Sequence, residues 1–267
     1  MEYETADGSQ FSLRTIESHH ESGQRRRAYV SVSAFVDGKA YCGRIEKNIE
    51  LLEDDEILNC LQPVPSECIH PPVPDGHPEA RPSQPKSQYL KAPSFTFEDC
   101  QPGSTFVADC FLNEATVLEK LMKHPHRNLA KYDGAVVGDG RIRQLCLQRY
   151  DCSLTQYLRQ HGSIIDREQR LMLLDDIKSG IQHLHDLEYA HNDINPDNIC
   201  VDSDGRAVIV DFDSCLPYGQ KLLKGVSSRE KRHAKNTPPV SHPENDWSGL
   251  DYTADILLGH SDPGSDA

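Results

Sequence analysis

Three polar side chains in the C-terminal third of the chain have the types and spacing that metal-assisted proton chemistry needs. Asp193 precedes Asn198 by five residues in HNDINPDN (191–198), and Asp211 follows the apolar run AVIV (207–210). One carboxylate could accept a proton from a hydroxyl nucleophile, whereas the amide and the other carboxylate are suitable oxygen ligands for Mg²⁺. Phosphoryl transfer uses these parts together, so we predict that the three side chains converge on one site.

Hydrophobic periodicity predicts the elements that would position these side chains. Residues 163–188 have the pattern of a long amphipathic helix, and Ser163 and Asp166 resemble a capping pair at its start. The apolar stripe of this helix would consist of Leu171, Leu174, Ile177, Ile181 and Leu184. After it, NICVD and AVIVD flank the turn SDG and predict a hairpin. Such a hairpin brings the ends that carry Asp193 and Asp211 side by side.

Regular elements are also predicted on either side of this region. QYLK (88–91) has the character of a short strand, and residues 132–150 predict two strands joined at Gly138-Asp139-Gly140. Residues 111–124 show helical spacing, with one face made of Phe111, Ala115, Leu118 and Met122. Residues 244–259 keep the helical period as well, through Trp247, Leu250, Ala254 and Leu257.

The chain divides into four regions by composition. Residues 1–61 predict a β-rich segment, with a hairpin turn at Asp37-Gly38. Residues 62–87 contain eight prolines, which predict a linker or extended strap without a regular element. Residues 88–259 would form the core, divided into 88–150 and 151–259, and residues 260–267 a disordered tail.

Bulk composition narrows the class of protein. The 267 residues are 37% hydrophobic and 26% charged, which is ordinary for a globular protein. The net charge of −14 argues against nucleic acid as a partner, and the basic runs 25–27 and 229–235 are expected to be solvated loops. Because neither a secretory signal nor an apolar run of about 18 residues occurs, we expect a cytoplasmic or nuclear protein without membrane association. Nine scattered cysteines without a CxxC pair predict free thiols rather than disulfides or zinc ligands.

The segments HNDINPDN and DFD resemble the catalytic and metal-binding loops of eukaryotic protein kinases, whose signatures are HRDxxxxN and DFG. They are most similar to divergent kinase-like proteins of filamentous fungi, which have HND and DFD. The resemblance implies an α+β, two-lobed protein-kinase-like fold, with a small β-rich N-lobe carrying one main helix and a truncated, mainly helical C-lobe. It also implies ATP and Mg²⁺, with Asp193 as the catalytic base, Asn198 as a metal ligand and Asp211 as the main magnesium ligand.

A kinase further needs a strand lysine paired with a glutamate on a helix, which together position the α- and β-phosphates. Lys91 is the candidate lysine, because QYLK is the strand-like segment before the helix at 111–124. Glu114 and Glu119 compete for the glutamate. Glu114 shares the apolar face with Leu118, whereas Glu119 lies well around the helix from it. We therefore predict the pair Lys91–Glu114.

Two structural features of kinases can also be assigned by this resemblance. Leu118 would stack toward Phe212 and His191, as in the kinase spine. Asp246 in NDWSGL resembles the aspartate whose side chain accepts hydrogen bonds from the backbone of the catalytic loop.

The sequence departs from the kinase pattern around the nucleotide. No GxGxxG loop precedes Lys91, so the backbone cradle that such a loop gives the phosphates is missing. Tyr89 takes the place of a small residue against which adenine packs; its ring would stack on the base or fill the base pocket.

Further departures fall within the catalytic segments. Asn192 replaces the HRD arginine, which leaves a phosphorylated activation loop without a cationic partner. Asn195 takes the place of the lysine that contacts the transferring phosphate, and by this position it is assigned to the cofactor site; the loss of the lysine charge could cost a few kcal/mol of transition-state stabilisation. Asp213 replaces the glycine of DFG and adds a carboxylate near the metal ions. No APE motif follows, and the helices that complete a kinase C-lobe are absent.

Three functions are compatible with these residues. The first is an ATP-dependent protein kinase, of Ser/Thr type and weakly active, with an unidentified protein substrate. The second is a pseudokinase that keeps the fold as a nucleotide-binding scaffold. The third is a small-molecule phosphotransferase resembling aminoglycoside and choline kinases, which use HxDxxxxN with DF[DE]. We favour the protein kinase, because Lys91, Glu114, Asp193, Asn198 and Asp211 are all retained.

Overall fold

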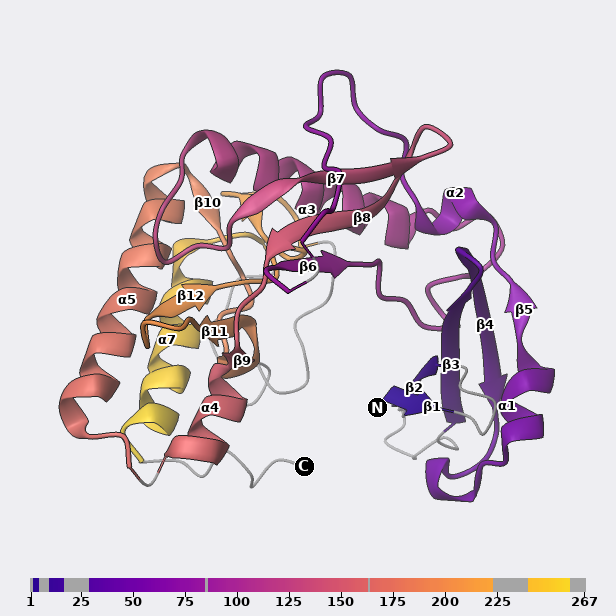
Figure 1. Cartoon of the computed structure of the whole chain (residues 1–267), viewed down its shortest axis with the longest axis horizontal. Helices are drawn as coiled ribbons and strands as arrows, with labels where there is room; N and C mark the ends of the chain where they lie inside the picture. Colours follow the sequence, from indigo (N-terminus) through magenta and orange to yellow (C-terminus); the bar gives the residue numbers. More distant parts are fainter. Residues whose placement is uncertain are drawn as a thin grey trace. The chain divides into compact units, whose positions relative to one another are not determined.

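The computed structural model describes residues 2–4, 10–16, 29–84, 86–162, 164–222 and 240–259. The described chain is of the α+β class, as predicted, and it forms two compact units (Figure 1). The first unit comprises residues 1–73, 92–111 and 138–143, and the second comprises 74–91, 112–137 and 144–267. The predicted core at 88–259 therefore falls mainly, but not wholly, in the second unit.

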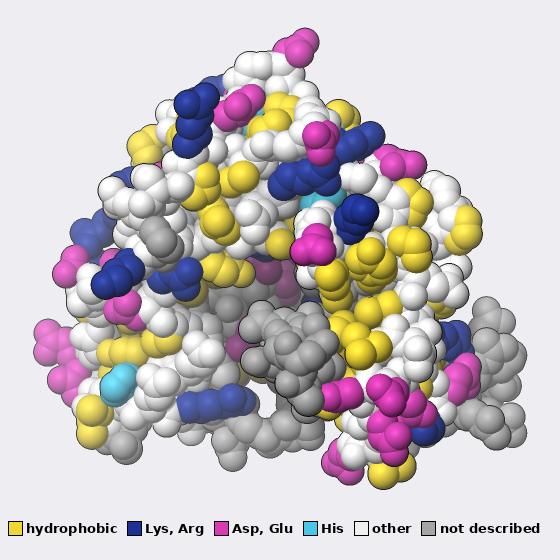
Figure 2. All heavy atoms as spheres, turned by 45° about the vertical axis from the view of Figure 1, so that its right-hand side comes forward, with side chains coloured by type: hydrophobic (Ala, Val, Ile, Leu, Met, Phe, Trp, Pro, Cys, Tyr) yellow, Lys and Arg dark blue, Asp and Glu magenta, His cyan; other side chains and the backbone are white. Residues whose placement is uncertain are grey.

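The first unit is built on a five-stranded sheet with the order β1-β2-β3-β4-β5. Its strands are β1 (Glu2–Glu4), β2 (Gln10–Ile16), β3 (Tyr29–Val36), β4 (Lys39–Ile45) and β5 (Gln62–Pro63). Its helices are η1 (Ile49–Leu51), α1 (Asp54–Cys60) and α2 (Ser66–Ile69). The hairpin predicted at Asp37-Gly38 is confirmed, with φ values of 48° and 73° that suit a type I′ turn. The first turn of α1 carries Asp54, Asp55 and Glu56. Figure 2 shows a group of acidic side chains, in magenta, on one part of the molecular surface.

Two apolar clusters hold the first unit together. One of them joins the sheet to α1 and consists of Phe11, Leu13, Val30, Val32, Ala34 and Ile57. The other consists of Ala40, Cys42, Val64, Cys68, Ile69, Phe95 and Val107. The prediction that residues 62–87 contain no regular element is wrong, because this segment contributes β5 and α2. Pro65 stands just before the first turn of α2, where a missing N–H costs nothing, and Cys68 and Ile69 are buried.

His70, at the end of α2, gives the first unit a predicted pH dependence. Its ring is buried beside Phe35, with 5.7 Å between ring centroids, and neither ring nitrogen has a hydrogen-bond partner among the described residues. Burial, reinforced by Arg143, lowers the pKa of His70 from 6.5 to about 4. The unfolded chain therefore binds a proton that the folded unit does not bind between these pH values, and folding stability falls as the pH falls.

We expect the first unit to lose about 2–3 kcal/mol of stability between pH 6.5 and pH 4, relative to a His70→Phe variant. Hydrogen exchange of the β3 and β4 amides measures the stability of this unit by itself. Parallel pH profiles of the wild type and the variant would contradict the assignment.

Among its described residues, the second unit combines three small sheets with four α-helices and one short 3-10 helix. Its strands are β6 (Gln88–Lys91), β7 (Tyr132–Gly138), β8 (Arg141–Gln148), β9 (Cys152–Ser153), β10 (Tyr189–Ala190), β11 (Ile199–Val201), β12 (Ala207–Ile209) and β13 (Leu216–Pro217). Its helices are α3 (Phe106–Lys123), α4 (Leu154–His161), α5 (Arg167–Asp186), η2 (Pro196–Asn198) and α7 (Pro243–Leu257). The sheet orders are β6-β8-β7, β12-β11-β9 and β10-β13. The ends of α3, β7 and β8 are grouped with the first unit.

Helix α5 contributes a row of buried apolar side chains to the core of this unit. Its buried side chains include Leu173, Ile177, Ile181 and Leu184, and the helix packs against β12, β10 and α7. Two stripe predictions need correction: Leu171 is exposed in α5 and Met122 is exposed in α3, whereas Leu173 and Leu121 are buried in their places. The predicted cap Asp166 is confirmed, because its side chain accepts a hydrogen bond from the backbone N–H of Gln169. Ser163, both basic runs and the tail at 260–267 lie outside the described residues.

The predicted thiol state is confirmed, since all nine cysteines are free. None of the helices in the described part of the chain has the length and apolar character that a membrane span requires.

Candidate active site

The predicted hairpin after α5 carries the candidate site. Strands β11 and β12 pair antiparallel, with Ile199 opposite Ile209 and Val201 opposite Ala207. The pairing continues one step further, because the backbone N–H of Val210 donates to the carbonyl of Asn198 at 2.9 Å. Asp211 is the next residue and has a φ of 64°, in the left-handed region that an aspartate tolerates better than most residues. The hairpin thus brings the segment with Asp193 and Asn198 beside the segment with Asp211, as predicted.

Two amide side chains hold the carboxylate of Asp193. The Nδ2 of Asn198 donates to Oδ2 of Asp193 at 2.7 Å, and the Nδ2 of Asn195 donates to Oδ1 at 2.9 Å. Asn195 also accepts hydrogen bonds from the backbone N–H groups of Asp197 and Asn198, so that it caps η2. Asn195 was predicted to contact the cofactor, but here its amide is used to orient Asp193.

Lys91, Glu114 and Asp211 form a second group of contacts in the same unit. The Nζ of Lys91 lies 2.7 Å from Oε1 of Glu114 and 2.8 Å from Oδ1 of Asp211. Oε1 of Glu114 also accepts a hydrogen bond of 3.2 Å from the backbone N–H of Phe212. The Glu114 side chain is 2% exposed, so these donors take the place of water around its charge. The predicted pair is therefore present, and Glu119 is not part of it.

The electrostatics of this group favour a charged lysine. Burial alone would lower the pKa of Lys91, but the carboxylates of Glu114, Asp211 and Asp213 raise it above its ordinary value. Burial raises the pKa of Glu114, and the ammonium of Lys91 opposes this rise. Because the two groups are 2.7 Å apart and Lys91 keeps its proton, the geometry supports an ion pair.

Two buried aromatic rings pack against each other next to the backbone of the site. The rings of His191 and Phe212 meet edge to face, with 5.3 Å between centroids, and Nε2 of His191 donates to the carbonyl of Val210 at 3.1 Å. Both rings are buried, as is Leu118 in α3. The stacking of Leu118 on these rings remains a prediction.

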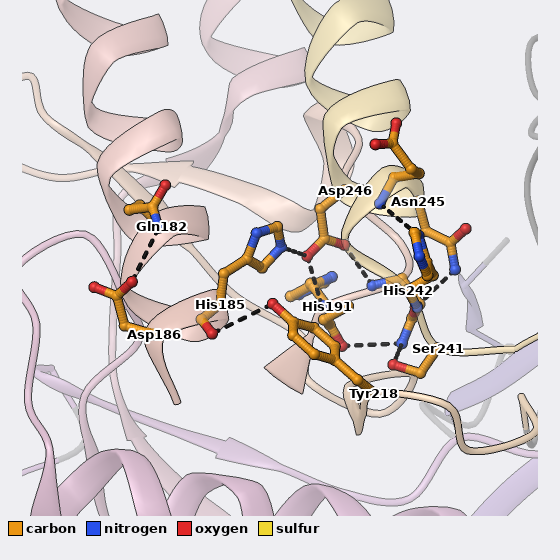
Figure 3. Close-up of polar contacts among 12 residues, drawn as sticks. Gln182, His185, Asp186, His191, Tyr218, Ser241, His242, Asn245 and Asp246 are labelled. Carbon is orange, nitrogen blue, oxygen red and sulfur yellow. Dashed lines mark hydrogen bonds and ion pairs between the residues drawn. The ribbon is translucent and has the colours of Figure 1, made fainter. Parts of the chain in front are cut away.

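Asp246 accepts hydrogen bonds from the backbone of the HND segment (191–193), as the resemblance implied (Figure 3). It is fully buried in the first turn of α7, and its carboxylate accepts hydrogen bonds from the backbone N–H groups of His191 at 2.9 Å and Asn192 at 2.7 Å. The Nε2 of His185, from the end of α5, is a third donor at 2.8 Å. Gly249 lets α7 approach the loop closely, since a Cβ at this position would lie 2.3 Å from the carbonyl oxygen of Ile194.

Asn192 is a residue whose role the sequence did not reveal. Its φ is 64°, and its amide nitrogen donates to the carbonyls of Ala190 at 2.9 Å and Ser214 at 3.0 Å. The same nitrogen lies 3.0 Å from Oγ of Ser241, and its oxygen accepts from Nδ2 of Asn245 at 2.8 Å. A neutral amide therefore ties the HND segment to residues after DFD and to residues around the start of α7. The tolerance of asparagine for positive φ was the one available signal.

Replacing Asn192 is expected to destabilise the second unit in two separable ways. Asn192→Ala removes the hydrogen bonds and forces an L-residue with a Cβ into the left-handed region, with an expected loss of about 2–4 kcal/mol. Asn192→Gly removes the same hydrogen bonds without the backbone penalty, so it should be about 1 kcal/mol more stable than the alanine variant. Denaturant unfolding of both variants measures the difference. Equal stabilities would show that the backbone conformation carries no cost.

Two other predicted site residues, Tyr89 and Asp213, make fewer contacts with the groups described above. Tyr89 is 47% exposed, and the guanidinium of Arg149 lies over its ring at 5.8 Å from the centroid. Its ring is therefore not buried in a pocket, and stacking on a base is the alternative that stays open. Asp213 is close enough to Lys91 to raise the pKa of that lysine, and it accepts a hydrogen bond from Oγ of Ser214 at 2.9 Å.

The donor set fits a magnesium ion that is shared with phosphate groups. With its nitrogen engaged by Asp193, Asn198 is left with Oδ1 as its remaining polar side-chain atom, next to the strand end that carries Asp211. Within the described residues, no three His, Cys, Asp or Glu side chains are grouped closely enough to hold a metal by themselves.

Comparison with known proteins supports the kinase resemblance. Residues 101–230 match the family model described as the protein kinase domain, a range that includes Glu114, Asp193, Asn198 and Asp211. Serine/threonine-protein kinase CLA4 of Candida albicans is 26% identical over 118 residues, which cover 44% of this chain and 11% of the relative. Human serine/threonine-protein kinase/endoribonuclease IRE2 is 28% identical over 178 residues, covering 60% and 19%.

A third relative, sperm motility kinase 3A of Mus musculus, is 35% identical over 83 residues, covering 30% of this chain and 16% of the relative. The chain thus spans between 11% and 19% of the length of these three relatives. The matched segment and the α+β architecture agree: residues 101–230 are similar to a protein kinase domain, and the described fold is protein-kinase-like.

Proposed function

We propose that this chain transfers the γ-phosphoryl group of ATP to a serine or threonine hydroxyl of a protein, with Mg²⁺ as the cofactor. The observation that carries the proposal is the contact of Lys91 with both Glu114 and Asp211, at 2.7 and 2.8 Å. This contact joins a strand, a helix and the DFD segment in the arrangement that ATP-dependent phosphoryl transfer requires. The HND and DFD segments further support kinship with the divergent fungal kinase-like proteins.

Each side chain has a distinct role in the proposed reaction. Asp193 accepts the proton of the attacking hydroxyl, and the side-chain amides of Asn195 and Asn198 orient its two carboxylate oxygens. The new bond forms between the hydroxyl oxygen and the γ-phosphorus, while the bond from the γ-phosphorus to the bridging oxygen breaks and ADP leaves. Lys91 neutralises the α- and β-phosphates, and Glu114 fixes its position.

Three oxygen ligands would hold the metal in this proposal. Asp211 and Asn198 are the principal ligands, and Asp213 is an additional carboxylate close to them. The magnesium ion supplies charge neutralisation at the phosphates. Tyr89 would stack on the adenine ring.

A nucleotide-binding scaffold is the second candidate, and the conformation of Asn195 favours it. The amide of Asn195 is neutral and donates to Asp193, so this position supplies no cation to the transferring phosphate. If the electrostatic contribution of that cation is lost, transfer becomes slow.

One experiment separates the candidate functions. The purified full chain is incubated with Mg²⁺ and labelled ATP, alone, with a mixture of protein acceptors, and with choline or an aminoglycoside. Asp211→Asn is the test variant. Asp204→Asn is its matched control, because it makes the same change at an exposed turn of the same hairpin.

Label on protein that requires Asp211 but not Asp204 supports the proposed kinase. Label on choline or the aminoglycoside assigns the chain to small-molecule phosphotransferases instead. Thermal stabilisation by ATP without any transfer identifies the scaffold. If neither stabilisation nor transfer occurs, all three proposals are wrong.

A further inference from the structure

The proline-rich residues 74–84, here called the strap, belong structurally to the kinase-like core. They are part of the same compact unit as β7 and the main part of α3. The strap runs parallel to β7 at Glu79 and Ala135. The backbone N–H of Ala135 donates to the carbonyl of Pro78, and that of Ala80 donates to the carbonyl of Ala135, both at 2.8 Å. The strap therefore pairs with β7, the last strand of the β6-β8-β7 sheet.

Two glycines make this close pairing possible. Gly134 has a φ of 127°, and a Cβ there would lie 2.8 Å from the carbonyl oxygen of Pro78, so no side chain fits. Gly76 has a φ of 74° in the turn that is closed by the hydrogen bond from the N–H of His77 to the carbonyl of Pro74. The turn directs His77 from the strap into the unit.

His77 connects the strap to two other elements. Its side chain is fully buried, with Nδ1 at 3.2 Å from Oε2 of Glu119 in α3 and Nε2 at 2.9 Å from the hydroxyl of Tyr132 in β7. The assignment that satisfies all three groups has Nδ1–H donating to Glu119 and the Tyr132 hydroxyl donating to Nε2. Glu119 additionally pairs with Lys123 at 2.6 Å.

These contacts hold α3 from a second side. Glu114 and Glu119 are five residues apart, which places them about 140° apart around the helix. Glu114 is held by Lys91 and by the backbone of Phe212, whereas Glu119 is held by His77. A rotation or shift of α3 that takes Glu114 away from Lys91 must also break the contact with His77.

We propose that the strap acts through His77 as an internal brace that keeps α3 in the orientation in which Glu114 reaches Lys91. His77 is thus a positioning residue: it touches neither nucleotide nor acceptor and acts through α3. The brace is supplied by the chain itself, so α3 needs no separate partner to adopt this orientation. Only the predicted change in the rate of phosphoryl transfer rests on the proposed function; the predicted change in hydrogen exchange does not.

The test combines hydrogen exchange with kinetics on the full chain. In His77→Ala we expect the amides of residues 112–123 to exchange about tenfold faster, while those of α5 keep their rates. We expect kcat to fall about tenfold, because fewer molecules hold the Lys91–Glu114 pair. Gly134→Val should reproduce both effects by displacing the strap with His77 intact. His77→Gln should restore part of the protection, since it keeps one hydrogen bond. Arg81→Ala, at an exposed position of the strap, is the control and should change neither rate.

The outcomes distinguish the brace from the proposed function. If the wild type transfers no phosphate, the kinase proposal fails, and the exchange rates of 112–123 still decide whether the strap holds α3. If the wild type is active and His77→Ala changes neither the exchange of 112–123 nor kcat, the brace does not exist. Faster exchange throughout both α3 and α5 would assign His77 a general role in stability and would also overturn the proposal.

Discussion

Replacing Asp193 with asparagine is expected to reduce phosphoryl transfer by about 10²- to 10⁴-fold, the usual contribution of a positioned general base. The variant keeps the size and polarity of the side chain but cannot take the proton of the attacking hydroxyl. Asn195 and Asn198 each donate an N–H to one oxygen of Asp193. An asparagine at position 193 would therefore also place its own N–H against one of these two donors. The affinity for ATP should stay within about threefold, because in the proposed reaction Asp193 acts on the acceptor hydroxyl rather than on the nucleotide.

Single-turnover transfer and calorimetric ATP binding together check this prediction. Asp204→Asn again serves as the control for the loss of one negative charge. A variant that keeps more than about a tenth of the wild-type rate would show that Asp193 is not the base. Loss of ATP binding would instead assign Asp193 to the nucleotide site.

Removing the Asp246 side chain should have the largest effect on stability. In Asp246→Ala, the backbone N–H groups of His191 and Asn192 and the ring N–H of His185 lose their common acceptor in a fully buried place. Breaking such a buried charged network typically costs about 3–5 kcal/mol. We therefore expect a stability loss of this size in the second unit, together with faster hydrogen exchange in residues 191–198.

Two further variants make this measurement specific. Asp246→Asn keeps one acceptor oxygen but places an N–H against the remaining donors, so its loss should be intermediate. Asp251→Ala changes an exposed aspartate of the same helix and should stay within about 0.5 kcal/mol of the wild type. A loss of less than about 1 kcal/mol in Asp246→Ala would contradict the role of Asp246 as the buried acceptor.

Local sequence patterns predicted the β11–β12 hairpin well because its elements are short and adjacent in the chain. Antiparallel pairing of two apolar strands across a tight turn leaves few alternatives, so Asp193, Asn198 and Asp211 could be brought together from spacing alone. Helical geometry was similarly sufficient to prefer Glu114 over Glu119 for the contact with Lys91. In both cases the geometry of a short, local stretch of chain, a tight hairpin or a single helix, decides which residues come together.

The errors occurred where a neighbouring element decides the outcome. The stripe predictions placed Leu171 and Met122 inside, but the buried face is set by what packs against α5 and α3, and this selected Leu173 and Leu121. The proline content of 62–87 led to the wrong prediction that this segment contains no regular element, whereas it contributes β5 and α2. It gave no indication that Pro78 and Ala80 would pair with β7 through main-chain hydrogen bonds, because these depend on a distant glycine, Gly134.

Asn192 and His77 were missed for a related reason. The HND motif includes Asn192 but does not reveal its contacts, and His77 belongs to no spaced motif. Each acts through partners that are more than 20 residues away in the chain, such as Ser214 for Asn192 and Glu119 for His77. Asn195 was assigned to the nucleotide by analogy of position. Its shorter side chain lets it turn back to Asp193, whereas the lysine that it replaces has no oxygen with which to cap η2.

The position of Lys91 has a consequence for the protein before any nucleotide arrives. Glu114, Asp211 and Asp213 are all close enough to Lys91 to raise its pKa, so its ammonium serves as the resident counter-ion of three carboxylates. Without that cation the carboxylates would repel one another, and Glu114, which is buried, would take up a proton more readily. A lysine usually regarded as a ligand of phosphate thus also neutralises the three neighbouring carboxylates when no nucleotide is bound.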